Sequence, residues 1–205
     1  MKFLIENQHR EYFNEYGLVE FEGLLSEREL AEFQEAVNGE MTSRGGGFWK
    51  GHDLWRTSDR ARKAVFSWRL AEIASQLSKE KPMRIAFDQF FSGAAPDALK
   101  EPVALETISS FQGLTSGLII RLSGSCEETT LVPKIAGSGV YFSPSASFDM
   151  KELFEAEGTF LLIAYVRARG VFIVSPQDPF RSQVQTLKYT VGDRLDEKRN
   201  PTIYR

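Results

Sequence analysis

The chain has 205 residues, 42% of them hydrophobic and 26% charged, and its net charge of −3 without a basic run indicates no nucleic-acid partner. The single cysteine, Cys126, can form neither an internal disulfide nor a cysteine-rich metal site, and its acidic neighbours disfavour a nucleophilic thiolate. The apolar runs are too short to span a membrane and the first residues do not resemble a signal peptide, so we expect a cytoplasmic protein that does not bind membranes.

The first third of the chain is predicted to be helical, apart from one short strand. Residues 7–15 favour a short helix, and residues 17–21 favour a short strand. Ser26 is followed by Glu three residues later, which is the spacing of a capping box. Apolar residues then recur at helical intervals, so we predict a helix over residues 27–38 that ends at Gly39.

A glycine-rich stretch, residues 42–51, separates this helix from a second helical region, in which Ser58 is a candidate N-cap. The loop over residues 44–52 is consistent with an anion cradle built from glycine amides together with Arg44 and Lys50. Its composition is more typical of a mobile lid or a plain surface loop.

From residue 82 onward, short runs of β-forming residues alternate with clusters of Gly, Pro, Asp and Ser. This order predicts an α+β protein, mainly β, with a jelly-roll or cupin-like double-stranded β-helix core and N-terminal helices. We expect one domain over residues 1–205, with a helical part (1–80) packed on the core (82–205). The expected strands are residues 83–91, 103–108, 117–122, 130–135, 140–142, 160–166, 171–174 and 183–191.

Several segments of the first 90 residues resemble the phytanoyl-CoA dioxygenase family: residues 16–26, 53–56, 67–74 and 87–89. The resemblance implies a double-stranded β-helix decorated by N-terminal helices, in agreement with the pattern of elements. It also implies oxidation by Fe(II) with 2-oxoglutarate as co-substrate.

That chemistry requires two histidines and one carboxylate on one face of the iron. By position, the family's His-x-Asp motif should fall within residues 107–112 and its second histidine within residues 142–145, and neither segment contains a histidine. The chain has two histidines, His9 and His52, and both precede the β-rich part. We therefore expect the iron site to be lost and the chain to be non-catalytic, without a cofactor.

An alternative keeps Fe(II) and 2-oxoglutarate in an atypical metal site built from His52, Asp53 and a core residue such as Asp88. The simpler interpretation of His52 is a surface or capping histidine. The resemblance also implies a late-strand arginine that binds 2-oxoglutarate, for which Arg167 and Arg169 are the nearest candidates. The candidate ligand-binding residues in the barrel mouth are thus Arg121, Arg167, Arg169, Ser109, Phe111 and Asp88.

Three hypotheses for function follow. The first is a non-catalytic β-helix protein that binds a small molecule in the barrel mouth, or a protein on its surface. The second is the atypical metal enzyme. The third is a structural or interaction protein, such as a homodimer formed through an exposed strand edge or a Phe-rich face.

Overall fold

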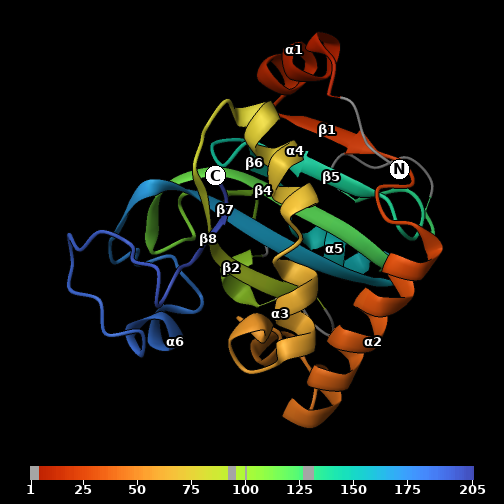
Figure 1. Cartoon of the computed structure of the whole chain (residues 1–205). Helices are drawn as coiled ribbons and strands as arrows, with labels where there is room; N and C mark the ends of the chain where they lie inside the picture. The colour runs from red at the N-terminus through yellow and green to blue at the C-terminus, as the bar shows by residue number, and fades with distance from the viewer. Residues whose placement is uncertain (1–4, 92–95, 100, 127–131) are drawn as a thin grey trace.

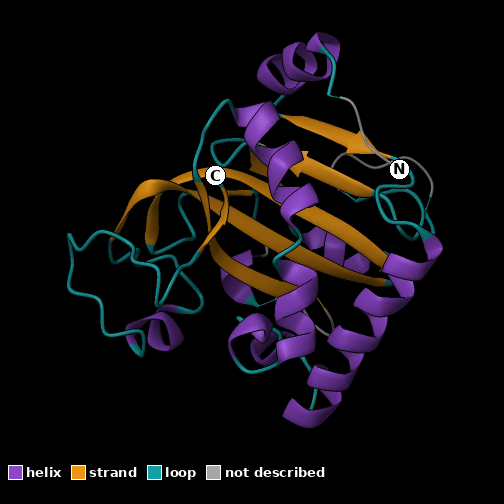
Figure 2. Cartoon of the chain, in the orientation of Figure 1, coloured by secondary structure: helices purple, strands orange, loops and turns teal. Residues whose placement is uncertain are grey.

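The computed structural model describes residues 5–91, 96–99, 101–126 and 132–205, and these residues form a central sheet covered by helices (Figures 1 and 2). The strands are β1 (Leu18–Phe21), β2 (Met83–Phe91), β3 (Val103–Ala104), β4 (Phe111–Ser123), β5 (Gly139–Phe142), β6 (Ser147–Phe148), β7 (Thr159–Phe172) and β8 (Thr202–Tyr204). Six of them pair in the order β1-β5-β4-β7-β2-β8, while β3 pairs with β6. Every one of these pairings is antiparallel.

The helices come mostly from the first third of the chain, as the sequence predicts. They are α1 (Asn7–Tyr16), α2 (Glu27–Arg44), α3 (Asp59–Val65), α4 (Trp68–Ser78), α5 (Lys151–Glu155) and α6 (Arg181–Gln185), with 3₁₀ turns η1 (Phe48–Lys50), η2 (Leu54–Arg56) and η3 (Asp97–Leu99). In Figures 1 and 2, α2, α3 and α4 lie across one face of the sheet. No helix among the described residues has the length and apolar character needed to cross a membrane.

The capping box at the start of α2 is confirmed, but its predicted end is wrong. The Ser26 hydroxyl accepts a hydrogen bond from the Glu29 amide, and the Glu29 carboxylate accepts one from the Ser26 amide. The helix continues through Gly39 and ends at Gly45, which has a φ of 85°. A glycine in a helix interior costs about 1 kcal/mol relative to Ala, and burial of Met41 beyond it offsets that cost.

The β-rich part also differs from its prediction in places. The two strands expected over residues 160–166 and 171–174 are one strand, β7. The strand predicted over residues 183–191 is wrong, because this segment continues from α6 into turns. Part of the strand predicted over residues 130–135 lies outside the described residues, and the rest contributes an isolated bridge at Ile135.

The sheet has a core on each face, because side chains alternate along each strand. On the helical face, Leu118, Ile120 and Tyr141 pack against residues of α2, α3 and α4. On the opposite, concave face, Ile119 and Phe142 join a cluster rich in phenylalanine. Concave, largely apolar surfaces are where proteins most often bind small ligands, and a cavity lies on this face.

Candidate functional site

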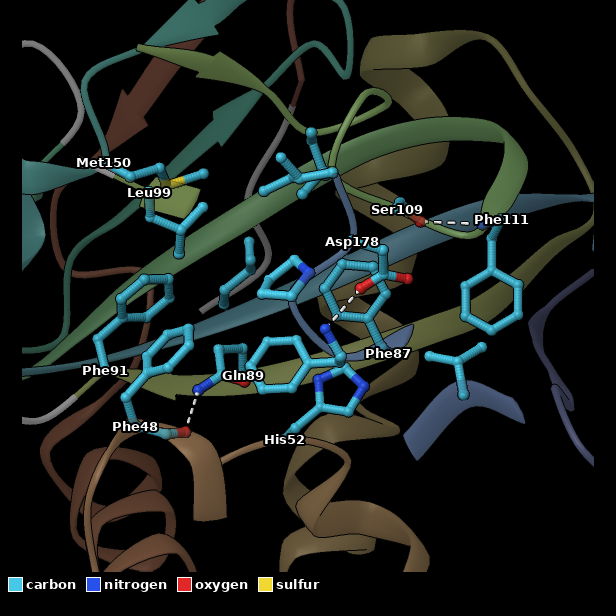
Figure 3. A pocket seen from close by; sticks show the side chains of 16 residues that line it. Phe48, His52, Phe87, Gln89, Phe91, Leu99, Ser109, Phe111, Met150 and Asp178 are labelled. Carbon is cyan, nitrogen blue, oxygen red and sulfur yellow. Dashed lines mark hydrogen bonds between the residues drawn. The ribbon is translucent and has the colours of Figure 1, made fainter. Parts of the chain in front are cut away.

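A narrow apolar cavity lies within the phenylalanine-rich core on the concave face (Figure 3). Phe87 of β2 and Phe111 of β4 form part of its wall, with ring centroids 6.5 Å apart. Aliphatic side chains, including Leu105 and Leu162, complete the wall. The cavity volume is about 20 Å³, which is room for one or two water molecules. The cavity is thus nearly filled by the side chains that surround it.

His52 and Gln89 place hydrogen-bonding atoms in this apolar surrounding. His52 is 8% exposed, and neither of its ring nitrogens makes a hydrogen bond of regular geometry, although the Gln89 side chain lies close enough to raise the pKa of His52 slightly. The Gln89 amide donates to the carbonyl oxygens of Phe48 and Phe90, while its own oxygen is buried without a partner. Burial lowers the pKa of His52, and the nearby carboxylates of Asp53 and Asp178 only partly oppose this effect. A neutral imidazole offers one donor and one acceptor.

The expectation of a surface or capping histidine at position 52 is therefore wrong, and Gly51 gives the reason. The Phe90 amide donates to the Gly51 carbonyl oxygen, and His52 forms a β-bridge to Gln89. A Cβ on Gly51 would lie 2.6 Å from the Phe90 carbonyl oxygen, so only glycine allows this close approach. The segment 51–53 is thereby held along β2, which turns the imidazole inward.

Two loops cover the cavity with aromatic rings. Phe180 stacks on His52 at a centroid distance of 4.0 Å and contacts Phe48 at 5.2 Å. Asp178 fixes the Phe180 loop, because its carboxylate accepts hydrogen bonds from the amides of Ser110 and Phe180. The Phe48 loop follows Gly45–Gly47, all of which have positive φ. The Phe180 loop is thus held in place by Asp178. The Phe48 loop, in contrast, follows three glycines whose backbone can change conformation easily.

Two of the six candidate ligand-binding residues line the cavity. Ser109 and Phe111 both contribute to the wall, and the Ser109 hydroxyl accepts a hydrogen bond from the Phe111 amide (Figure 3). Asp88 is fully buried but faces the helices, where its carboxylate accepts hydrogen bonds from the amides of Leu54 and Trp55. The side chains of Asp88 and Gln89, which are neighbours on β2, therefore lie on opposite faces of the sheet.

The three candidate arginines lie apart from the cavity wall. Arg121 is fully buried near the end of β4, where it donates to the carbonyl oxygens of Pro133, Ser123 and Glu157. Arg167 and Arg169 are exposed on β7. Arg121 thus joins the end of β4 to two neighbouring loops.

The donor set of the concave face does not fit the iron that the resemblance implies. Among the described residues, no group of three His, Cys, Asp or Glu side chains is placed to hold a metal ion. The two histidines lie on opposite faces of the sheet, since His9 contacts Phe21 of the helical core while His52 contacts Phe87 of the concave core. Asp53 is held by an ion pair with Arg56, 2.6 Å between Nε and Oδ2.

Gln89, Asp178 and Phe180 are site residues that sequence reasoning missed. Gln89 had a detectable signal, because it is a polar residue inside a run of strand-forming apolar residues. Asp178 and Phe180 lie in a turn that precedes a short helix, and nothing local indicates that this turn folds back over β4.

Comparison with known proteins assigns the fold. No protein-family model and no curated protein matches the sequence. Among solved structures, the non-haem α-ketoglutarate-dependent carbocyclase SnoK from nogalamycin biosynthesis is similar at a TM-score of 0.74, with 96% of each chain covered. The epimerase SnoN of the same biosynthesis also has a TM-score of 0.74, over 97% of this chain and 95% of its own. The chain therefore shares its fold with these α-ketoglutarate-dependent non-haem enzymes.

The predicted α+β class with a double-stranded β-helix core is thus confirmed. HygX from Streptomyces hygroscopicus, solved with nickel and 2-oxoglutarate, is a further match at a TM-score of 0.53, over 80% of this chain and 87% of its own. Sequence identities to SnoK, SnoN and HygX are 16%, 15% and 11%. At such identities the likeness extends to the fold and not to the chemistry.

Proposed function

We propose that the chain is a non-catalytic, phytanoyl-CoA dioxygenase-like protein that binds a small, largely apolar molecule carrying one hydroxyl or amide group. One observation supports this proposal above all: His52 and Gln89 hold unpartnered polar atoms inside an apolar cavity. Buried polar groups are almost always hydrogen-bonded, so atoms left without a protein partner indicate a bound water or ligand.

The chemistry of the two side chains selects the ligand. The neutral His52 ring can donate one hydrogen bond and accept another, and the free Gln89 oxygen can only accept. A hydroxyl group placed between them can accept a hydrogen bond from the imidazole N–H and donate one to the Gln89 oxygen. The aromatic and aliphatic wall, with Phe87 and Phe111 facing the space, suits a flat ring attached to that hydroxyl.

Binding requires the aromatic cover to move, because the closed cavity has room for water only. A phenol-sized ligand enters only when Phe48 and Phe180 separate. The three glycines before Phe48 supply a backbone that can change conformation at low cost. The cavity is therefore closed in this structure, and ligand binding requires the loop that carries Phe48 to move.

In this assignment the protein does not carry out the iron chemistry of the enzymes that share its fold. Fe(II) and 2-oxoglutarate require a 2-His-1-carboxylate set, and the described concave face offers His52 with no second histidine beside it. A purified sample supplied with Fe(II) and 2-oxoglutarate should then retain no stoichiometric iron and release no succinate. Stoichiometric iron together with succinate release would overturn the non-catalytic assignment.

The binding itself is tested by ¹⁹F NMR titration with 4-fluorophenol and fluorobenzene. His52→Phe keeps a ring stacked on Phe180 and removes both nitrogens. We expect this variant to bind 4-fluorophenol about five- to tenfold more weakly, the loss of one hydrogen bond, and fluorobenzene unchanged. His9→Phe, the same substitution on the opposite face, should change neither affinity. Failure of both probes to bind the wild-type protein refutes the proposal.

A further inference from the structure

A second, open pocket lies beside the cavity and shares His52 with it. This surface pocket has a volume of about 310 Å³. Its walls come from the end of α2, from the η1 and η2 turns, and from the α6 region, which contributes Leu187. His52, stacked on Phe180, is the partition between the surface pocket and the apolar cavity.

Among the described residues, the charged side chains that line the surface pocket, taken together with the Glu40 partner of Arg44, sum to one positive charge. Arg44 is paired with Glu40 at 2.8 Å, and Arg56 is paired with Asp53 at 2.6 Å. Lys50, which is exposed, remains as the additional cation. His52 is neutral because burial lowers its pKa. The surface pocket therefore matches a ligand group that carries a single negative charge.

Unpartnered buried atoms at the surface pocket point to a ligand group of this kind. Arg44 is saturated, since it donates to the backbone carbonyls of the loop and to Thr57. Arg56, in contrast, has a buried Nη2 with no acceptor. The ring nitrogens of His52 are also free, and His52 is more than nine-tenths buried. Arg56, His52 and Lys50 all line the surface pocket, and Arg56, Lys50 and one nitrogen of the neutral His52 ring can donate hydrogen bonds.

We infer that the surface pocket binds the carboxylate of an aryl or branched aliphatic acid, whose apolar part points past His52 towards the cavity. The inference deepens the proposed function and rests on it, since the cavity supplies the apolar end. A carboxylate is a planar monoanion with two acceptor oxygens, which suits the free Nη2 of Arg56 together with Lys50. Trp49, 52% exposed, offers a flat apolar wall beside them.

The test compares 4-fluorophenylacetate with its uncharged analogue, 4-fluorophenylacetamide, by ¹⁹F NMR titration. The acid should bind the wild-type protein about tenfold more tightly than the amide. Added salt should lower the affinity for the acid and leave the affinity for the amide unchanged. Lys50→Ala should lower the affinity for the acid about fivefold, and Lys50→Glu more strongly, with no change for the amide. Lys63→Ala is the matched control, because Lys63 is an exposed lysine that lines a different groove.

The outcomes separate the two proposals. Equal affinities for acid and amide in the wild-type protein, or an acid affinity that Lys50→Glu leaves unchanged, overturn the carboxylate pocket. In either case, binding of the uncharged 4-fluorophenol leaves the proposed function standing. If neither the acid nor any uncharged probe binds, the cavity takes no ligand and both proposals are refuted.

Discussion

Replacing Asp88 with Asn should change how the stability of the protein depends on pH. Asp88 is fully buried on the helical side of β2, where its two carboxyl oxygens accept hydrogen bonds from the amides of Leu54 and Trp55. Burial, with a contribution from the Asp53 carboxylate, raises the pKa of Asp88 from 3.8 to about 8, and the two backbone hydrogen bonds only partly oppose this rise. At pH values between these two pKa values, the folded protein thus holds a proton on Asp88 that the unfolded chain has released.

The sign and size of the effect follow from this difference. Between the two pKa values the folded state binds more protons than the unfolded state, so the free energy of unfolding falls as pH rises. One pKa unit corresponds to about 1.4 kcal/mol, and raising the pH from about 5.5 to about 8 should therefore cost the wild type about 3 kcal/mol through Asp88 alone. Asn is neutral at every pH, so Asp88→Asn should lack this loss.

Urea unfolding at the two pH values, on the wild type and on Asp88→Asn, measures the effect. At the lower pH the variant should be the less stable of the two by about 1 kcal/mol, since Asn replaces one acceptor with a donor. At the higher pH the order should reverse, because only the wild type then carries a buried charge. Parallel pH dependences in the two proteins would refute the protonated state of Asp88.

Two matched pairs of substitutions test the packing. Gly117→Ala should unfold the protein or lower its free energy of unfolding by several kcal/mol, because a Cβ at this position would lie 2.2 Å from the Phe142 ring. Gly39→Ala, where nothing lies within 4 Å of the added Cβ, should instead stabilise α2 by up to about 1 kcal/mol. Tyr141→Phe removes a hydrogen bond to the Leu70 carbonyl oxygen and should cost about 1 kcal/mol. Tyr165→Phe, which removes a fully buried hydroxyl without a partner, should be neutral or stabilising. Thermal melts of the four variants check both pairs; equal losses within either pair would contradict the packing described.

The features that sequence reasoning predicted correctly depend on near neighbours. The Ser26 capping box is set by residues three apart, and the continuous run of strand-forming residues from Met83 to Phe91 forms a single, largely buried strand. The end of α2 was misplaced because tertiary burial of Met41 outweighs the local preference of Gly39 to end a helix. The fold class followed from the succession of short strands and from the family resemblance together.

The site was harder to predict because its contacts are distant in sequence. Ser109 and Phe111 line the cavity, as expected of residues near the start of a core strand. The inward position of His52 depends on the pairing of Gly51 with β2, and the position of Phe180 depends on the bonds of Asp178 to a strand far earlier in the chain. Gly51 and Phe90, like Asp178 and Ser110, are too far apart in the sequence for any local pattern to contain both residues of the pair. Only the assembled sheet brings these residues to one cavity.

The segment that positions His52 also has a consequence for the integrity of the sheet. β8 pairs with β2 only at Met83 and Arg84, and segment 51–53 bonds to the backbone of β2 at Asp88 and Phe90. At the other end of the sheet, β1 shields β5. Two segments from the first third of the chain, β1 and residues 51–53, therefore cover strand edges on the two sides of the sheet. A fragment starting at residue 82 would expose unpaired backbone N–H and C=O groups on β5 and β2 and would be prone to aggregate through them.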